Sequence, residues 1–270
     1  MLGVRQRGFF IPCRYASAAV ATETGYPGLE PLFRAAEGRF GQVMLAIERR
    51  APELLALGEG KPPEARWTQD WFPRLDAAAA WAMIGERRPR RLVEVGSGHS
   101  TRFFVRAAAD AALSLAIVAI DPAPRALLRG LNVTFIQKPV QRAGDGPFGE
   151  LEPGDVLSLD GSHVLMPGTD VDVVLNRVLP RLPPGVLVHI HDVFLPDGYP
   201  ADWRWRGYNE QLAIAALLQS GGWRVLWSSR WVATRLADRL EGTVIARLPL
   251  LAGAHESSLW LEKRADGIPL

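Results

Sequence analysis

Two acidic residues and a glycine turn have the spacing of a small-molecule binding site. Glu94 stands two residues before Gly96 in VEVGSGHST, where a predicted strand gives way to a helix, and Asp121 ends the next predicted strand in AIDPAP. Gly96 and Gly98 permit positive φ and a close backbone approach to a ligand, and the first turn of the helix presents free amide groups. An acid at the tip of the second strand can accept hydrogen bonds from ribose hydroxyls.

The charge of Glu94 separates the ligands that use such a turn. Beside the pyrophosphate of a dinucleotide this carboxylate would be repelled by about 1 kcal/mol or more, whereas it would attract the ammonium and sulfonium groups of S-adenosylmethionine. The third glycine of the dinucleotide motif G-x-G-x-x-G is also missing, because Thr101 occupies its place. The turn therefore favours S-adenosylmethionine over a nicotinamide cofactor. The alternative is that Glu94 and Asp121 only cap helices or lie in solvated turns.

A second set of polar residues follows two later predicted strands. Asp160 and His163 end DVLSLDGSH, and His191 and Asp192 close VLVHIHD. Because the carboxyl ends of parallel strands meet at one edge of a sheet, we expect these four side chains to lie beside the ligand. They could bind a divalent cation such as Mg²⁺ or Mn²⁺, or a histidine could act as a general base oriented by a carboxylate. Ordinary hydrogen bonding at the sheet edge is the third interpretation, and we favour it for His189.

Short β-branched runs that alternate with helical patterns must position these residues. The predicted strands are, in order, RLVEV, LAIVAI, NVTFIQ, DVLSLD and VLVHIHD. Helices are expected at residues 101–112, 124–128, 170–179 and 208–218. This alternation predicts a doubly wound α/β fold with a mostly parallel sheet. WRVLWSS and SSLWLEK add two strands without a long helix between them, so we expect the last strand to be antiparallel.

The N-terminal part follows a different pattern. Apolar residues from 29 to 47 have the spacing of an amphipathic helix, and GEGKPP at 58–63 is typical of a linker. We therefore expect an N-terminal helical extension over residues 1–65 and a ligand-binding domain over residues 66–270. The extension would pack on the sheet domain, and a homodimer interface is the alternative use of its apolar face.

The composition excludes several classes of protein. Hydrophobic residues make up 48% of the chain and charged residues 22%, as in ordinary globular domains. The net charge of +2 comes without a block of like charge, so no nucleic-acid partner is expected. Cys13 is the single cysteine, which excludes an internal disulfide framework and fits a reducing compartment. Because no apolar run approaches the roughly 20 residues of a membrane span and the first residues lack a secretory signal, we expect a soluble cytoplasmic protein.

The glycine turn also carries a family resemblance. VEVGSG resembles the first motif of class I S-adenosylmethionine-dependent methyltransferases, and Asp121 resembles their ribose-binding acid. VEVGSGHSTRF, the DGSH turn, GVLVHIHDVFLPDGYP and W-x-x-YNEQ are similar to one bacterial branch of that family, over nearly the whole chain. The resemblance implies a seven-stranded Rossmann-like sheet with a reversed last strand. It also implies S-adenosylmethionine as cofactor, with contacts from Glu94, Gly96, Ser97, Gly98, Asp121, Val140, Gln141 and Asp160.

The later strand ends resemble those of catechol-type and sugar O-methyltransferases, in which acidic residues hold a divalent cation. Asp160, His191 and Asp192 match these positions, with His191 in place of the usual aspartate. The resemblance implies a metal that lowers the pKa of an acceptor hydroxyl. Metal-free catalysis by His163 or His191 remains open beside it.

A long aromatic segment, FLPDGYPADWRWRGYNEQ, is expected to cover the acceptor. Trp203, Trp205 and Tyr208 would form an apolar wall or only dock the loop, and residues 69–71 would cover the site from the other side. Our hypothesis is methyl transfer to an oxygen of a small polar or sugar-like acceptor. A metal-dependent hydroxylase or oxygenase on the same sheet is one rival, and a cofactor-binding module without catalysis is the other.

Overall fold

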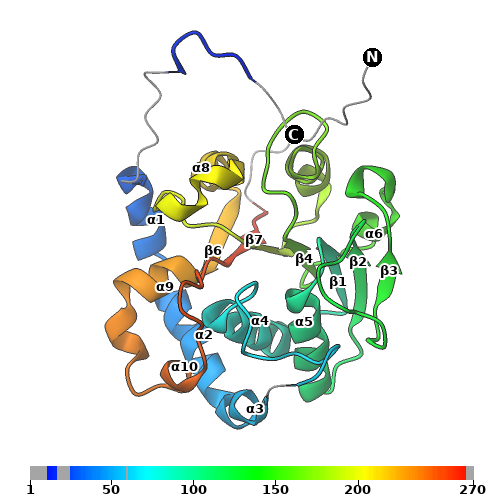
Figure 1. The fold of residues 1–270 in the computed structure, drawn as a ribbon, viewed down its shortest axis with the longest axis vertical. Coiled ribbons are helices and arrows are strands. Elements are labelled where there is room, and N and C mark those ends of the chain that lie inside the picture. Colours follow the sequence, from blue (N-terminus) through cyan, green and yellow to red (C-terminus); the bar gives the residue numbers. More distant parts are fainter. Residues whose placement is uncertain (1–10, 17–24, 59, 266–270) are drawn as a thin grey trace.

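The sheet has the predicted topology. The computed structural model describes residues 11–16, 25–58 and 60–265. Within them, strands hydrogen-bond in the order β3-β2-β1-β4-β5-β7-β6 (Figure 1). The bounds of the strands are β1 Arg91–Val95, β2 Ala116–Ile120, β3 Thr134–Ile136, β4 Val156–Leu159, β5 Leu187–Ile190, β6 Trp223–Ser228 and β7 Leu259–Lys263. β1 to β5 are parallel and β7 is antiparallel to β5 and β6, which confirms the doubly wound sheet with a reversed last strand.

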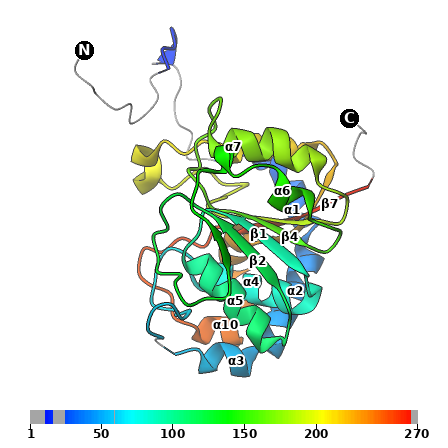
Figure 2. The ribbon, with the colours of Figure 1, turned by 90° about the vertical axis from the view of Figure 1, so that its right-hand side faces the viewer.

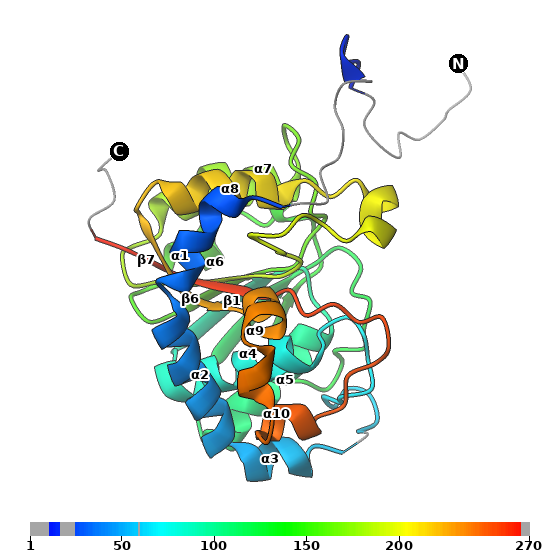
Figure 3. The same cartoon turned by 90° about the vertical axis from the view of Figure 1, so that its left-hand side faces the viewer.

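Helices cover both faces of this sheet. The α-helices are α1 Glu30–Arg34, α2 Glu37–Arg49, α3 Ala51–Ala56, α4 Arg74–Arg87, α5 His99–Asp110, α6 Gly146–Gly149, α7 Asp170–Val173, α8 Glu210–Gln219, α9 Ser229–Arg235 and α10 Val244–Arg247. The 3-10 helices are η2 Pro27–Leu29, η3 Val140–Arg142, η5 Leu179–Arg181, η6 Ala201–Arg206 and η7 Ala237–Leu240, and η4 Val174–Val178 is a π-helix that continues α7. α7 and α8 lie on one face, and α2, α4 and α5 lie on the other (Figures 2 and 3).

Helix α4 is the most enclosed of these elements. Every residue from Leu75 to Gly85 is buried, which is typical of a helix that is surrounded by other elements rather than one with a solvent face. Its alanines have small side chains, so α5 and α2 can pack closely against it. The first turn of α4 reaches the carboxyl ends of the strands, where it contributes to the site described below.

Two helices differ from the prediction. Residues 124–128 form a bend within irregular backbone instead of a helix. Asp121 accepts the N–H of Ala123 at 2.7 Å, and Arg102 donates to the carbonyl of Leu127 at 2.9 Å, so side chains take the place of helical hydrogen bonds there. The helix predicted over residues 29–47 is divided into α1 and α2 by a turn at residues 35 and 36.

The N-terminal helices pack against the reversed end of the sheet. Phe33 of α1 stacks on Trp231 at 5.7 Å between ring centroids, and Phe40 of α2 meets Trp227 edge-on at 6.0 Å. These rings belong to the same buried cluster as the strands. The division of the chain at residue 65 and a homodimer stay predictions. In the part of the chain that the structure describes, no helix combines the length and the apolarity that a membrane crossing requires.

Candidate active site

The turn after β1 lies where the strand order reverses, because β1 has β2 on one side and β4 on the other. In such sheets ligands bind outside the carboxyl ends of these strands. Gly96 has a φ of 81°, and a Cβ added to it would lie 1.8 Å from the carbonyl oxygen of Asp160. The Asp160 amide in turn donates to the carbonyl of Val95 at 2.8 Å. Gly96 therefore allows the tips of β1 and β4 to touch.

Glu94 supports this turn from below. Its side chain is fully buried and accepts hydrogen bonds from the hydroxyls of Ser100 and Thr101, both at 2.5 Å. The Thr101 hydroxyl also accepts the N–H of Gly98 at 3.0 Å. Glu94 is not part of the cavity wall. Glu94 therefore supports the turn from behind the cavity wall, and its direct contact with a cofactor stays a prediction.

A cavity of about 330 Å³ opens in front of the turn. The other predicted cofactor-binding residues all line it, namely Gly96, Ser97, Gly98, Asp121, Val140, Gln141 and Asp160. Asp121 accepts the N–H and the hydroxyl of Ser97 at 2.8 and 3.0 Å and the N–H of Ala123 at 2.7 Å. Its carboxylate is therefore held in place at the tip of β2.

The segment before α4 covers the mouth of this cavity. Trp71 lines the cavity, and the guanidinium carbon of Arg125 lies 4.6 Å from the centroid of its ring. The buried side chain of Gln69 fixes the segment, because its carbonyl oxygen accepts two backbone N–H groups at 2.9 and 2.7 Å. Trp71 thus lies where residues 69–71 were expected, whereas no motif in the sequence indicates Arg125.

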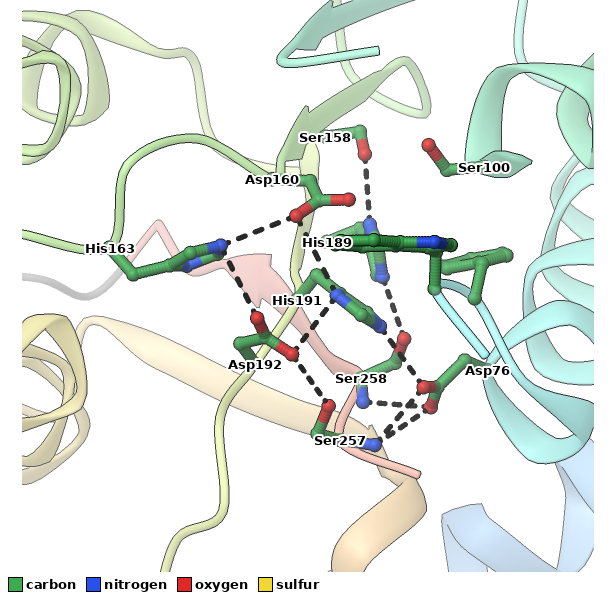
Figure 4. Close-up of polar contacts among 12 residues, drawn as sticks. Asp76, Ser100, Ser158, Asp160, His163, His189, His191, Asp192, Ser257 and Ser258 are labelled. Atoms are coloured by element: carbon green, nitrogen blue, oxygen red, sulfur yellow. Dashed lines mark hydrogen bonds and ion pairs between the residues drawn. The ribbon is translucent and has the colours of Figure 1, made fainter. Parts of the chain in front are cut away.

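Asp160 also belongs to a group of four side chains that lies on the side away from the cavity. We call this group the ring; its members, in order of contact, are Asp160, His163, Asp192 and His191 (Figure 4). Nε2 of His163 lies 3.3 Å from Oδ1 of Asp160 and 3.4 Å from Oδ2 of Asp192. Nδ1 of His191 lies 3.6 Å from Oδ1 of Asp160 and 3.3 Å from Oδ1 of Asp192. The structure thus brings together all four predicted catalytic residues, with imidazoles and carboxylates in alternation.

Two further acids contact the outer nitrogens of the imidazoles. Oε2 of Glu210 lies 2.9 Å from Nδ1 of His163, and Oδ2 of Asp76 lies 3.1 Å from Nε2 of His191. Glu210 is the last but one residue of the aromatic segment and the first residue of α8. Asp76 comes from the first turn of α4. The sequence does not single it out, because acids are common in the first turn of a helix, where they interact favourably with the helix dipole.

The predicted aromatic wall is divided between two roles. The ring centroid of Tyr208 lies 4.6 Å from that of His163, so Tyr208 borders the acceptor side. Trp203 packs edge-on against Phe194 at 5.2 Å and docks the loop. Trp205 is 81% exposed and contributes no wall in this arrangement.

Residues 93–193 match the family model that is described as a methyltransferase domain. The matched residues run from β1 through β5 and include the glycine turn, most of the cavity and the whole ring. The chain contains a class I methyltransferase domain. The cofactor of this class is S-adenosylmethionine.

Solved structures of two methyltransferases and of a polyamine synthase are among those similar to this chain. The SAH-bound methyltransferase PaMTH1 from Podospora anserina is 16% identical, with 95% of this chain and 99% of that chain covered and a TM-score of 0.44. For an O-methyltransferase from Bacillus cereus in complex with SAH, the identity is 13%, the coverage 83% and 91%, and the TM-score 0.45. The branched-chain polyamine synthase from Thermus thermophilus is 16% identical, with 81% of this chain and 65% of that chain covered and a TM-score of 0.48. None of the curated proteins is similar enough to the chain to match it.

The ring of this methyltransferase is strongly charged. Burial opposes the ionisation of Asp160, but attraction to His191 and a hydrogen bond with His163 outweigh it and hold the Asp160 pKa well below its usual range. Burial is likewise outweighed at both histidines, mainly by the charge of Asp192, so that their pKa values lie well above the usual one. Two imidazolium groups therefore neutralise the central carboxylates.

The residues that could hold a cation share Asp160 and Asp192 with the predicted set. Among the described residues, Asp160, His163 and Asp192 offer ligand atoms that all lie within 4.8 Å of one another. The prediction named His191 in the place of His163. Nδ1 of His191 also faces Asp160 and Asp192, with Asp76 on its Nε2, so a role for His191 as a cation ligand stays a prediction. His163 also has the support typical of a metal ligand, since Glu210 contacts its second nitrogen.

His189 lies one layer deeper, as expected from its place in the strand. It is fully buried, and its two ring nitrogens are hydrogen-bonded to the hydroxyls of Ser158 at 2.8 Å and Ser258 at 2.9 Å. Burial lowers its pKa to about 3. This neutral histidine connects β4, β5 and the start of β7, and it has no direct contact with the cavity.

Glu94 gives the folded protein a distinctive pH dependence. Burial raises its pKa from 4.5 to about 8, against the effect of the Ser100 and Thr101 hydrogen bonds. Between these values the folded state keeps a proton that the unfolded chain releases, so the contribution of Glu94 to stability falls by about 1.4 kcal/mol per pH unit as the pH rises. In Glu94→Gln this loss is absent. We expect urea unfolding at pH 5, 6, 7 and 8 to show that the free energy of unfolding of the variant rises relative to that of the wild type as the pH increases. If the difference between the two proteins were the same at every pH, the raised pKa of Glu94 would be contradicted.

Proposed function

We propose that this methyltransferase transfers the methyl group to an oxygen atom of a small, polar or sugar-like acceptor. The observation that supports this most directly concerns Asp160, which lines the cofactor cavity and also belongs to the ring. A hydroxyl group bound at the ring would therefore lie next to the end of the cavity. Such a juxtaposition is what in-line transfer between two bound groups requires.

The cavity offers a seat for each part of the cofactor. Asp121, at the tip of β2, would accept the ribose hydroxyls, and Val140 and Gln141 would border the adenine. The glycine turn and the first amides of α5 would hold the methionine half. Once bound, S-adenosylmethionine supplies a methyl group that is activated by a sulfonium. The residues of the chain hold it and exclude water from the reaction.

His163 is the proton acceptor in this proposal. Glu210 orients its ring through Nδ1, so that Nε2 faces the space between Asp160 and Asp192. The pKa of His163 falls when the sulfonium of the cofactor is bound beside these carboxylates. Nε2 then loses its proton to solvent and has a free lone pair. While the oxygen–carbon bond forms and the carbon–sulfur bond breaks, with its electron pair left on sulfur, the hydroxyl proton passes to Nε2.

A divalent cation would fit the same place. Asp160, His163 and Asp192 would hold it, and Mg²⁺ or Mn²⁺ there would lower the pKa of the acceptor hydroxyl. One lone pair on Nε2 cannot serve a metal and a proton at once. Our proposal gives it to the proton, because the imidazolium of His191 already supplies a positive charge beside both carboxylates.

Asp121→Ala is expected to weaken the binding of S-adenosylhomocysteine about 100-fold. The variant loses the acceptor for the ribose hydroxyls and the anchor of Ser97, and hydrogen bonds to a charged group contribute about 1.5–3 kcal/mol each. Titration calorimetry measures the dissociation constant. The control is Asp110→Ala, whose carboxylate pairs with Arg106 at 2.9 Å at the far end of α5, and which should bind within twofold of the wild type. Unchanged affinity in Asp121→Ala would remove the ribose assignment.

The reaction is tested with methyl-labelled S-adenosylmethionine and a panel of sugars, polyols and phenols. We expect release of S-adenosylhomocysteine together with a labelled methyl ether, identified by mass spectrometry. Label on nitrogen or carbon, or no transfer to any hydroxyl compound in the panel, would contradict the proposed function.

A further inference from the structure

The first turn of α4 carries a buried carboxylate that faces away from its own helix. Asp76 is fully buried, and an acid in a first helical turn ordinarily interacts with the free amides of that turn. Here the carboxylate accepts the N–H groups of Ser257 at 3.1 Å and Ser258 at 2.8 Å, just before β7. These two bonds fix the orientation of the carboxylate toward the strand ends.

The same carboxylate fixes the imidazole of His191. Oδ2 of Asp76 lies 3.1 Å from Nε2, and the Phe72 ring packs against the imidazole at 5.4 Å between centroids. With one nitrogen held by α4 and one side covered by Phe72, the imidazole has one orientation. In that orientation Nδ1 faces Asp192 at 3.3 Å and Asp160 at 3.6 Å (Figure 4).

We propose that Asp76 is a positioning residue of the acceptor site, and that through His191 it sets the direction of the Asp160 and Asp192 carboxylates. This inference rests on the proposed function, since it concerns the place where the acceptor hydroxyl would bind. Misplacement of a catalytic group by about 1 Å can cost about 100-fold in rate. A helix that precedes β1 thereby controls the geometry at the ends of β4 and β5.

If Asp76 only connected α4 to the segment before β7, its replacement would have the same effect as the replacement of Glu256. Glu256 also connects α4 to the segment before β7, because it accepts the N–H of Leu75 at 2.8 Å and pairs with Arg74 at 2.9 Å. It is buried like Asp76, and none of its contacts within the described residues is with His191. Glu256→Gln is therefore a matched control, which weakens the same connection without disturbing the imidazole.

Crystal structures of Asp76→Asn and Glu256→Gln test the first link. The new amide keeps an oxygen for the N–H of Ser258 but loses the acceptor for His191. We expect the imidazole to rotate and the Asp192 carboxylate to turn in Asp76→Asn, and both to stay in place in Glu256→Gln. A His191 that keeps its place in Asp76→Asn, or that moves equally in both variants, would overturn the proposal. The comparison needs no acceptor, so its outcome does not depend on the proposed function.

Kinetics test the second link. Asp76→Asn should lower kcat by about 10- to 100-fold, while Glu256→Gln keeps kcat within twofold and both keep the affinity for S-adenosylhomocysteine. His191→Gln should lower kcat similarly, and adding Asp76→Asn to it should change nothing more, because the two residues act through one contact. Additive losses would refute the proposal. A wild-type kcat in His191→Gln would refute it as well, and this test applies even if Asp76→Asn does not fold.

Wild-type protein that methylates no hydroxyl compound would refute the proposed function, and the crystal comparison would still decide the role of Asp76.

Discussion

Gly96→Ala is expected to lower the free energy of unfolding by about 4 kcal/mol or more and to abolish measurable binding of S-adenosylhomocysteine. The added methyl group would lie 1.8 Å from the carbonyl oxygen of Asp160, which is backbone and cannot move aside without opening the contact between β1 and β4. The φ of 81° adds strain for any residue with a side chain. Losses of this size are exceptional for a single substitution and indicate such an overlap. Urea unfolding and titration calorimetry measure the two effects.

Gly98→Ala is the matched control in the same turn. The nearest atom to its added Cβ is the Cβ of Ala126 at 4.0 Å, and its φ of 171° is ordinary extended backbone. Gly98 is the N-cap of α5, so the replacement should cost about 1 kcal/mol or less. If both variants lost the same stability, the close approach of Gly96 to β4 would not be what the turn requires.

The sheet and the cofactor cavity are predictable because their signals are local. β-branched runs indicate the strands, and the residues that follow each run necessarily come to the same edge of a parallel sheet. Gly96, Ser97 and Asp121 are therefore placed at the cavity by their position in the sequence alone. Their predicted neighbours Val140 and Gln141 line the cavity for the same reason, since they follow β3.

The electrostatic state of Glu94 could not be predicted in the same way. The sequence shows a carboxylate beside a glycine turn, which suggests a negative charge facing the ligand. The hydroxyls of Ser100 and Thr101 instead hold the carboxyl group behind the turn. Burial there raises its pKa to about 8, against the effect of these hydrogen bonds. Burial depends on how α5 packs against β1, and no spacing of residues in the turn reports it.

The contacts that organise the ring are distant in sequence. Asp76 and His191 are separated by 115 residues, and His163 and Glu210 by 47, so no local pattern joins them. His163 has a positive φ of 57°, which is uncommon outside glycine. Such backbone strain is typical of functional sites, but only the structure shows it. This is why the sequence indicates the strand ends but not how His163 and His191 are supported there.

The largest loss of activity is expected for His163→Asn, with kcat about 100- to 10,000-fold lower. Asparagine tolerates the positive φ of this position, and its amide can still bond to Glu210, but it cannot accept the hydroxyl proton. Because His163 is not on the cavity wall, the dissociation constant of S-adenosylhomocysteine should stay within twofold. His255→Asn is the control, since His255 contacts Asp202 at 3.5 Å and the aromatic rings of Phe194 and Trp203, and none of the four ring residues. Nearly normal kcat in His163→Asn would exclude it as the proton acceptor.

Added Mn²⁺ and a chelator decide which use His163 makes of its free lone pair. A histidine that only holds a cation leaves Asp160 and Asp192 behind when it is replaced, so excess Mn²⁺ should restore part of the activity of His163→Asn. A histidine that takes the proton cannot be replaced by metal, and the variant should remain inactive at every Mn²⁺ concentration. We expect the second result, together with wild-type turnover that survives the chelator, because His191 already supplies a positive charge beside both carboxylates. Restoration by Mn²⁺ would instead make Glu210 the support of a metal ligand, and the proton would then need another acceptor.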